Sequence, residues 1–263
     1  MTLKILAPNY YSRYHEVVKS LGKGKLVLNL GCGDGFYEGE LKKRFEFVIG
    51  MDINAQDVKI ARWINTGKSI NYLVGDGCLL PFKDNVFNEI ICVDVIEHIK
   101  KDKTLLHEIS RDLKKNGYLT ITTSNLDFPF TYDPINYILQ KFNTHIPLGL
   151  WGFGHERLYT KDNLIRLLQK NKFKILHTKK TLHYLTGIFE NYYLINLLQP
   201  LTKSDPKNKG EKLRDREILI KRVKKKPPRF LLSSVKNLIK LDNFLFKNSK
   251  RSLGILVRAK KTG

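Results

Sequence analysis

One stretch near the N-terminus decides the fold class of this 263-residue chain: Lys25-Leu26-Val27-Leu28-Asn29-Leu30-Gly31-Cys32-Gly33-Asp34-Gly35-Phe36. Apolar, strand-forming residues run directly into three glycines at alternate positions, and the residues that follow can open a helix. A buried strand, a tight glycine turn and a helix N-terminus together form a pocket for a nucleotide-like ligand. Glycine is required there because the backbone turns with positive φ and because the ligand lies against main chain without a Cβ in the way.

The spacing of the glycines indicates which ligand is bound. A dinucleotide fingerprint reads G-x-G-x-x-G/A, and its third small residue lets the helix pack closely on the strand. Here that position is Phe36, and the glycines follow the pattern G-x-G-x-G. Asp52 ends the next strand-like run, 21 positions after Gly31, the interval at which a carboxylate reaches ribose hydroxyls. The alternative is a plain strand–helix turn with a solvent-exposed Asp52.

Two more acidic residues close strand-like runs: Asp76 follows residues 71–75, and Asp94 follows residues 89–93. Taken alone, each is more often a turn or cap residue. Four apolar runs that each end in Gly or Asp, however, are typical of a parallel sheet whose carboxyl ends line one ligand crevice. Asp76 is a candidate partner for an exocyclic amine such as that of adenine, because an ionised carboxylate only accepts hydrogen bonds.

In their order and spacing these segments resemble the class I S-adenosylmethionine-dependent methyltransferases over residues 26–124, and more loosely to residue 181. The matching segments are Val27-Leu28-Asn29-Leu30-Gly31-Cys32-Gly33-Asp34-Gly35, Gly50-Met51-Asp52-Ile53, Gly75-Asp76-Gly77-Cys78-Leu79-Leu80-Pro81-Phe82 and Val93-Asp94-Val95-Ile96-Glu97-His98-Ile99. The resemblance implies an α/β, doubly wound fold with a seven-stranded, mostly parallel sheet. It also implies S-adenosyl-L-methionine as the cofactor.

The resemblance also implies the cofactor contacts. Gly31, Cys32 and Gly33 would lie against the methionine part of the cofactor. Asp52 would hold the ribose, and Asp76 would accept a hydrogen bond from the adenine amine. The further cofactor-binding positions are Asn29, Ile53, Gly77 and Asp94. The family commonly has an acid where Asn29 stands, and asparagine keeps an acceptor but loses the charge that would face the cofactor ammonium.

Composition narrows the partners. The chain is 42% apolar and carries a formal net charge of +22, which points to nucleic acid, an anionic membrane or a phosphorylated substrate. Three cysteines without C-x-x-C spacing (Cys32, Cys78 and Cys92) indicate neither a zinc site nor a disulfide framework, so we expect a reducing, cytoplasmic setting. No signal-peptide segment and no run of 18 apolar residues is present, so we expect no membrane-spanning segment.

Periodicity predicts the remaining elements. Helices are expected from Asn9 to near Gly22, over 55–66, over 102–114 with Asp102 as a candidate N-cap, and after the N-cap Thr160. Strands are expected at 26–31, 46–52, 70–74, 88–94, 118–123, 173–181 and 252–259, and the resemblance places the last one antiparallel between the fifth and sixth. Residues 125–159 lack periodicity and are a candidate substrate loop.

The predicted domains are a methyltransferase core (1–186), a basic helical insertion (187–250) and the last core strand (251–263). Residues 199–261 hold 20 Lys and Arg against 5 Asp and Glu. The insertion begins with apolar and aromatic residues (188–198), continues with a basic cluster (221–229) and ends in a helical pattern (230–246). Three interpretations remain: a helical subdomain packed on the core, peripheral docking on an anionic membrane, and nucleic-acid binding.

Two histidines are candidate catalytic bases for a hydroxyl acceptor, His98 after the fourth strand and His155 before the helix at 160. Each can equally be a packed residue that anchors a loop. Asp94, Glu97, His98 and His155 are also similar to the metal-assisted arrangement of two branches of the family, the quinone O-methyltransferases and the small-RNA terminal 2′-O-methyltransferases. Asp94 replaces a Glu of that arrangement, and we predict no bound metal.

The predicted function is methylation, by an S-adenosylmethionine-dependent enzyme, of a hydroxyl on a small or lipid-linked acceptor at a membrane surface. The first alternative is an RNA methyltransferase, for which the basic insertion would supply phosphate contacts. The second is a non-catalytic protein on the same scaffold. The acceptor atom is not predicted, because acceptor specificity lies in residues 125–159 and in the insertion.

Overall fold

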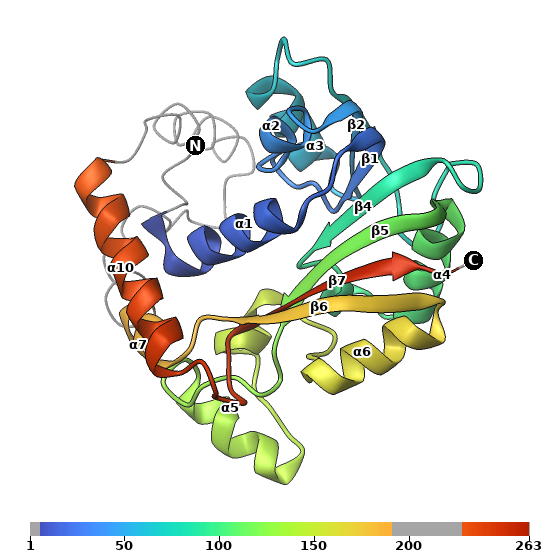
Figure 1. The fold of residues 1–263 in the computed structure, drawn as a ribbon. Coiled ribbons are helices and arrows are strands. Elements are labelled where there is room, and N and C mark those ends of the chain that lie inside the picture. The colour runs from blue at the N-terminus through green and yellow to red at the C-terminus, as the bar shows by residue number, and fades with distance from the viewer. Residues whose placement is uncertain (1–5, 191–227, 263) are drawn as a thin grey trace, which may run out of the picture.

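The computed structural model describes residues 6–190 and 228–262. These residues contain one seven-stranded sheet with helices packed on it (Figure 1). The strand order is β3-β2-β1-β4-β5-β7-β6, and only β7 runs antiparallel to its neighbours. The strands are β1 (Gly24–Leu30), β2 (Phe45–Asp52), β3 (Asn71–Val74), β4 (Phe87–Val93), β5 (Leu113–Ser124), β6 (Phe173–Thr181) and β7 (Gly254–Lys261). The predicted fold class and the place of the last strand are confirmed.

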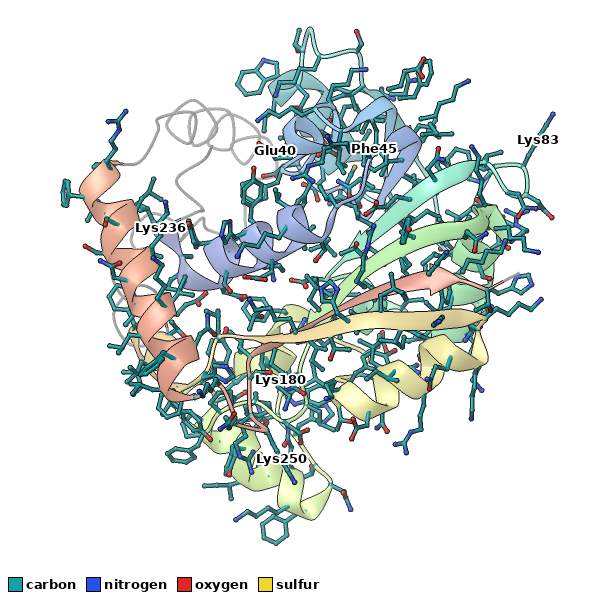
Figure 2. All side chains as sticks on the ribbon, in the orientation of Figure 1. Glu40, Phe45, Lys83, Lys180, Lys236 and Lys250 are labelled. Atoms are coloured by element: carbon teal, nitrogen blue, oxygen red, sulfur yellow. The ribbon has the colours of Figure 1, made fainter. Side chains whose placement is uncertain are left out.

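Helices cover both faces of the sheet, as the doubly wound arrangement requires. Helices α4 (Asp102–Asp112) and α6 (Lys161–Lys170) pack on one face, and α1 (Pro8–Ser20), α2 (Glu38–Leu41) and α3 (Ala55–Ile64) pack on the other. The alternation of β1 explains the two layers, because Leu28 and Leu30 face the α4 side while Val27 faces the α1 side. Side chains fill both layers, and Lys83 projects from the turn before β4 (Figure 2).

A buried ion pair fastens the last strand to the middle of the sheet. Arg258 of β7 forms hydrogen bonds through both terminal nitrogens with the carboxylate of Glu89 on β4, and it also donates to the hydroxyl of Thr120 on β5 at 2.6 Å. Glu89 and Arg258 are 1% and 6% exposed, so neither charge is compensated by water. Removing one partner would leave a buried uncompensated charge and would destabilise the fold.

Two boundary predictions near α4 are wrong. The helix predicted over 102–114 ends at Asp112, and β5 begins already at Leu113, five residues before the predicted strand. Asn116 there has a φ of +65°, so this strand begins with an irregular segment rather than after a separate turn. Asp102 is not the N-cap but the first residue of the helix, and its carboxylate binds Arg157 and Tyr159 at 2.8 Å each. The N-cap Thr160 is confirmed, because its hydroxyl accepts from the amide of Asn163.

Short helices lie in the predicted substrate loop: α5 (Pro134–Leu139), η3 (Gln140–Phe142) and η4 (Gly149–Phe153). After β6 follow α7 (Tyr184–Ile188) and, beyond the undescribed residues, α10 (Arg229–Leu245). Asp242 of α10 is fully buried and accepts hydrogen bonds from the amides of His183 and Leu185, so it caps α7 and fixes α10 beside it.

Helix α10 confirms the helical pattern predicted for 230–246, whereas the apolar and basic parts of the insertion lie mostly outside the described residues. Within the described ranges, no helix combines the length and the apolar character needed to cross a bilayer.

Candidate active site

The glycine turn after β1 closes against the end of β2. The amides of Gly31 and Cys32 both donate to the carbonyl oxygen of Met51, at 2.8 and 3.0 Å. Gly31 has a φ of +74°, and a Cβ there would lie 2.1 Å from Cγ2 of Val95. Gly33 has a φ of +51°, and a Cβ there would meet no described atom within 4 Å. Packing therefore requires Gly31, whereas open space over Gly33 leaves its main chain accessible to a ligand.

Asp52 is tied to this turn at the end of β2. Its Oδ2 accepts from the amide of Gly33 at 2.8 Å, and its Oδ1 accepts from the amide of Asn54 at 2.9 Å. Backbone donors thus hold a carboxylate at the mouth of the turn, where it can accept hydrogen bonds from hydroxyl groups of a ligand. The neighbouring Ile53 is 71% exposed and offers an apolar surface beside it.

The residues after β3 extend the same edge of the sheet. Asp76 is exposed, and its Oδ1 accepts from the amide of Cys78 at 2.8 Å. A Cβ at Gly77 would lie 2.8 Å from Cδ1 of Leu105, so this glycine packs directly on α4. Since β3, β2 and β1 are consecutive in the sheet, Asp76, Asp52 and Gly31 lie in that order along the carboxyl edge.

Asn29 lies beneath the turn and pairs with a carboxylate that sequence reasoning missed. Its Nδ2 donates to Oε1 of Glu38, the first residue of α2, at 2.9 Å. Both side chains are buried, and neither Oδ1 of Asn29 nor Oε2 of Glu38 has a hydrogen-bond partner among the described residues. Burial raises the pKa of Glu38 to about 7. The acid that is absent at position 29 is therefore matched by one from the following helix.

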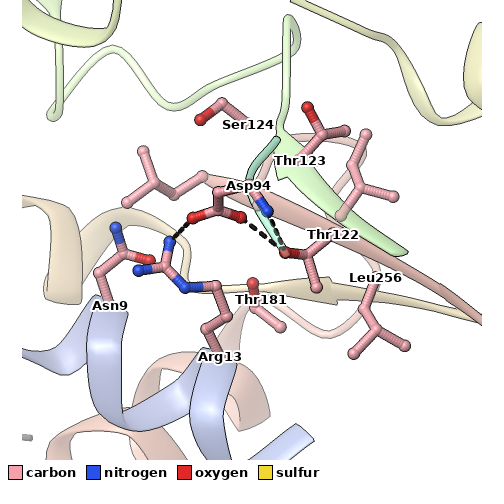
Figure 3. Close-up of a pocket in the computed structure, with 11 residues that line it drawn as sticks. Asn9, Arg13, Asp94, Thr122, Thr123, Ser124, Thr181 and Leu256 are labelled. Atoms are coloured by element: carbon pink, nitrogen blue, oxygen red, sulfur yellow. Dashed lines mark hydrogen bonds and ion pairs between the residues drawn. The ribbon is translucent and has the colours of Figure 1, made fainter. Parts of the chain in front are cut away.

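Asp94, after β4, faces helix α1 rather than the glycine turn (Figure 3). One carboxylate oxygen is paired with the guanidinium of Arg13 from α1, and the other accepts from the hydroxyl of Thr122 at 2.6 Å. Asp94 has a φ of +52°, an uncommon conformation for a residue other than glycine. The geometry thus directs this predicted cofactor residue toward a second pocket, which α1 covers.

Glu97, His98 and His155 converge next to that pocket. One potential ligand atom from each side chain lies within 4.8 Å of the other two, and the two imidazole centroids are 4.7 Å apart. Oε1 of Glu97 accepts from the amide of Ser124 at 3.2 Å, while its Oε2 is buried without a described partner. Nδ1 of His98 lies 3.2 Å from the carbonyl oxygen of Gly154, which fixes that ring if Nδ1 carries the proton.

His155 is the half-buried imidazole of this cluster. Burial, and then the charge of the neighbouring His98, lowers the pKa of His155 to about 4, so the imidazole is neutral at pH 7. Its Nδ1 is buried and has no hydrogen-bond partner in the described part of the chain. The amides of Glu156 and Arg157 donate to the carbonyl oxygen of Glu97, at 2.8 and 3.3 Å, and these bonds hold the segment that carries His155 against Glu97.

The structure therefore sorts the predicted site residues into two groups along one edge. Asn29, the glycine turn, Asp52 and Asp76 line the part next to β1–β3. Asp94, His98 and His155 line the part next to β4 and β5. Sequence reasoning missed Arg13 and Glu38, because both lie in helices without a motif. The only sequence signal for Arg13 was its place among the aromatic residues of the first helix.

Comparison with known proteins identifies the family. Residues 28–121 match a family model described as a methyltransferase domain. Residues 28–121 therefore form a methyltransferase domain of the class I, S-adenosylmethionine-dependent type. The family prediction, made from the glycine turn and the acidic strand ends, is confirmed, and so is the predicted cofactor type.

Two curated relatives and one solved structure illustrate the similarity of this methyltransferase. An uncharacterised protein, MJ0638, from Methanocaldococcus jannaschii is 39% identical over 169 residues, 64% of this chain and 63% of that protein. A ubiquinone biosynthesis O-methyltransferase from Idiomarina loihiensis is 29% identical over 105 residues, 39% of this chain and 43% of that protein. The chain thus spans about half the length of these relatives.

The solved structure is a geranyl diphosphate C-methyltransferase from Streptomyces coelicolor in complex with Mg²⁺, geranyl diphosphate and S-adenosyl-L-homocysteine. Its sequence is 13% identical to this chain. The two structures superpose with a TM-score of 0.58 over 95% of this chain and 77% of that chain. At this identity the match supports the fold alone.

Proposed function

We propose that this methyltransferase transfers a methyl group from S-adenosyl-L-methionine to a hydroxyl of a small or lipid-linked acceptor at a membrane surface. The observation that carries the proposal is the cluster of Glu97, His98 and His155. It lies at the carboxyl edge beside the predicted cofactor residues, and it joins a neutral imidazole to a buried carboxylate. A hydroxyl acceptor needs such a group, because its oxygen must lose a proton as it attacks the methyl carbon.

The chain's own residues would act in two steps. The glycine turn, Asp52 and Asp76 would hold the cofactor, while the pocket under α1 would hold the acceptor in line with the methyl–sulfur bond. As the acceptor oxygen attacks, Nδ1 of His155 would accept the hydroxyl proton, and the neighbouring Glu97 carboxylate would stabilise the imidazolium that forms.

The same three side chains are a donor set for a divalent cation. Two imidazoles and a carboxylate suit such an ion, and a bond from Nδ1 of His98 to the Gly154 carbonyl is the kind of contact that orients metal-binding histidines. In this alternative, Glu97, His98 and His155 would hold the cation, whose charge would lower the pKa of the acceptor hydroxyl, and His155 would be a ligand instead of the proton acceptor. A thermal shift with Mg²⁺, Mn²⁺ or Zn²⁺ that disappears in a His98→Ala variant would identify this site without an activity assay.

Exposed apolar side chains support a membrane-bound acceptor. Helix α10 exposes five large apolar residues: Phe230, Leu231, Leu241, Phe244 and Leu245. The segment that leads to His155 exposes six more: Phe130, Ile135, Ile138, Phe142, Leu148 and Phe153. Apolar side chains next to basic residues favour docking on an anionic bilayer. The relative from Idiomarina loihiensis is named a ubiquinone biosynthesis O-methyltransferase, which is consistent with O-methylation of such an acceptor.

The proposal is tested with isotopically labelled cofactor and separate lipid and RNA extracts. Mass spectrometry should find O-methylated species in the lipid or small-molecule fraction, and Asp52→Ala should reduce their amount at limiting cofactor concentration. Label confined to RNA would establish the RNA methyltransferase alternative, and no label in any fraction would favour a non-catalytic scaffold.

Membrane docking is tested separately by sedimentation with vesicles that contain phosphatidylserine. A Phe230→Ser/Phe244→Ser variant should sediment less than the parent protein, because each of these side chains is about 70% exposed on α10 (69% and 71%). Equal sedimentation of variant and parent would remove α10 from the docking surface. The basic cluster 221–229, on which the sequence-based membrane prediction also rests, lies almost wholly outside the described residues.

A further inference from the structure

Asp94 is the one predicted cofactor-binding residue that lines the pocket under α1 (Figure 3). The pocket lies where β4, β5 and β6 end and β7 begins. It is lined by Asn9 and Arg13 of α1, Asp94, Thr122–Ser124, Thr181 and Leu253–Leu256. Ser124 connects it to the catalytic cluster, because its amide donates to Glu97 at 3.2 Å. An acceptor bound in this pocket would therefore lie next to the cluster of Glu97, His98 and His155.

The pocket is lined by polar groups that can donate hydrogen bonds, together with one carboxylate. Of the described residues that line it, Arg13 is the one cation and Asp94 the one carboxylate. The remaining polar side chains are four hydroxyls and the amide of Asn9, all of which can donate hydrogen bonds. A pocket of this composition suits an oxygen-rich group that accepts hydrogen bonds.

Arg13 is held in place for such a group. Its side chain is 19% accessible, and its guanidinium carbon lies 4.9 Å from the centroid of the Tyr10 ring. Asp94 is its counter-ion and is itself fixed by Thr122, so the guanidinium stays oriented without a ligand. A guanidinium carries five N–H donors, and the ion pair with Asp94 leaves donors for a second anion.

The positive charge of Arg13 also acts on the catalytic cluster. Burial raises the pKa of Glu97, and Arg13 is one of the groups that oppose this rise. The same opposing effect of Arg13 is present at Glu190, whose pKa burial raises to about 7. Arg13 lines the same pocket as Ser124, whose amide donates to Glu97, so one acceptor can contact Arg13 at one end and approach Glu97 at the other.

From this geometry we infer that Arg13 binds an anionic group, a carboxylate or a phosphate, carried by the acceptor beside the hydroxyl that is methylated. Asp94 is a positioning residue that keeps the guanidinium in the pocket when no acceptor is bound. A neutral acceptor would not form charge-assisted hydrogen bonds with Arg13. The remaining N–H donors of the guanidinium would then lack a partner in the pocket. The inference rests on the proposed function, and it adds a substrate class that neither the fold nor the family match supplies.

Three hydroxylated probes test the inference in the full chain: 4-hydroxybenzoate, 4-hydroxyphenyl phosphate and the neutral 4-hydroxybenzamide. Calorimetry in the presence of S-adenosyl-L-homocysteine should show binding of at least one anionic probe, with affinity at least tenfold above that of the amide. Arg13→Gln should remove this preference, and Arg13→Lys should retain part of it because the charge remains without the bidentate geometry. The comparison of benzoate with phosphate decides which anion the pocket prefers.

Kinetics separate anion recognition from a merely structural role. For an acceptor that is turned over, Arg13→Gln should raise KM for the anionic probe by roughly 10–100-fold and leave KM for the amide unchanged. Lys19→Gln, on the same helix but exposed and paired only with Glu16 in the described chain, is the matched control and should change neither value. Equal losses for anionic and neutral probes, with cofactor affinity intact, would overturn the inference and leave Arg13 as a support for Asp94.

The binding experiment also distinguishes this inference from the proposed function. If an anionic probe binds through Arg13 but no probe or extract is methylated, the inference stands and the proposed reaction fails. If extracts are methylated on hydroxyls but the anionic probes bind no better than the amide, the reaction stands and the inference fails.

Discussion

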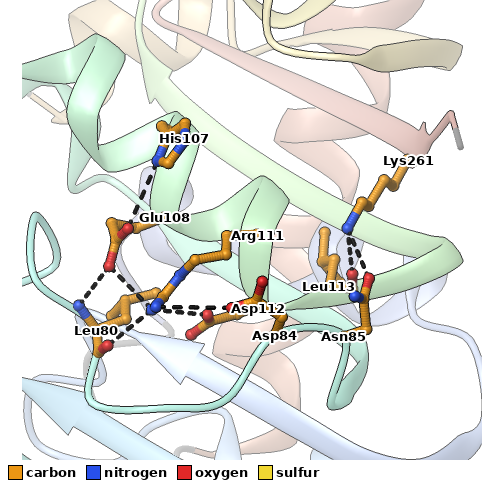
Figure 4. Close-up of polar contacts among 9 residues, drawn as sticks. All are labelled: Leu80, Asp84, Asn85, His107, Glu108, Arg111, Asp112, Leu113 and Lys261. Carbon is orange, nitrogen blue, oxygen red and sulfur yellow. Dashed lines mark hydrogen bonds and ion pairs between the residues drawn. The ribbon is translucent and has the colours of Figure 1, made fainter.

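The two ends of the same sheet differ in how they hold charge. At the carboxyl edge, charged groups are buried or held by backbone donors, as for Glu38, Asp52 and Glu97. At the opposite, amino edge a groove of about 820 Å³ is lined only by polar residues, and several of them are lysines. Arg111 there is bound by Glu108, Asp112 and the carbonyl of Leu80 (Figure 4).

The lysines of this groove differ from the acids of the carboxyl edge in their contacts and in their exposure to solvent. Lys261 donates to Asn85 and to the carbonyl of Leu113, at 2.9 and 2.7 Å, and so serves the fold. Lys115, Lys170 and Lys172 are exposed and form no ion pair with any described carboxylate. Water and salt screen such charges. Burial shifts pKa values at both edges, since it raises the pKa of Asp112 to about 6 at the amino edge, but these three lysines stay solvated. Their positive charge therefore marks a solvated surface.

The largest difference between the two edges should be in turnover. His155→Ala should lower kcat by about 10²–10⁴-fold with little change in cofactor affinity, because it removes the proton acceptor. Since burial lowers the pKa of His155 to about 4, the acid limb of the parent protein's pH–rate profile should lie well below pH 6.5. The amino-edge control His107→Ala, with 74% of its side chain exposed, should have normal turnover. Normal turnover of His155→Ala would exclude this residue from the reaction.

The next effect should be on cofactor binding. Asp52→Ala should weaken S-adenosyl-L-methionine binding by roughly 1–3 kcal/mol, because it removes charge-assisted hydrogen bonds to the ribose. Isothermal titration calorimetry measures this loss, and the parent protein should bind S-adenosyl-L-methionine in preference to NAD. Asp84→Ala at the amino edge, where 65% of the side chain is exposed, should bind the cofactor normally. Tighter binding of NAD would contradict the assignment of the glycine turn.

A smaller effect should appear in the pH dependence of stability. The pKa of Glu38 is about 7 when folded and near 4.5 when unfolded, so the folded chain holds this proton more tightly. The free energy of unfolding should therefore fall as pH rises from about 4.5 to 7, since ionisation costs more in the buried site. Glu38→Gln should weaken this fall and raise Tm at pH 8 by a few degrees, about 2–4 °C per kcal/mol.

The control for Glu38 lies two residues away on the same helix. Glu40 forms an ion pair with Lys43 at 2.7 Å near the surface, so Glu40→Gln should leave the pH profile of Tm almost unchanged. Thermal melts between pH 5 and 8 measure these profiles. Identical profiles of Tm against pH for the parent protein and Glu38→Gln would show that ionisation of Glu38 does not lower the stability of the fold.

The smallest effect should follow neutralisation of the amino-edge lysines. Changing Lys115, Lys170 and Lys172 to Gln, singly, should alter the free energy of unfolding by no more than about 0.5 kcal/mol each. Chemical denaturation at low and high salt measures this change, and any difference should disappear as salt rises. A loss of several kcal/mol in one variant would mean that the groove is part of the fold and would remove the contrast between the edges.

Much of the fold was predictable because its signals are local. The glycine turn after β1, the apolar alternation of the strands and the N-cap Thr160 each depend on residues within a few positions of one another. The start of β5 was missed because Leu113 fits a helix as well as a strand by periodicity, and strand pairing with Phe87 decided between them. Asp102 was misassigned for a similar reason, since Arg157 and Tyr159 claim its carboxylate from 55 and 57 positions away.

By itself, the sequence determined the fold class, the family and the order of the acids along the carboxyl edge, because strand ends followed by Gly or Asp are a local and regular pattern. Only the tertiary structure paired Asn29 with Glu38, brought His98 to His155 and placed Arg13 beside Asp94, 81 positions away. These pairs depend on how helices and loops pack over the sheet. Burial, which follows from that packing, sets their pKa values and their chemistry.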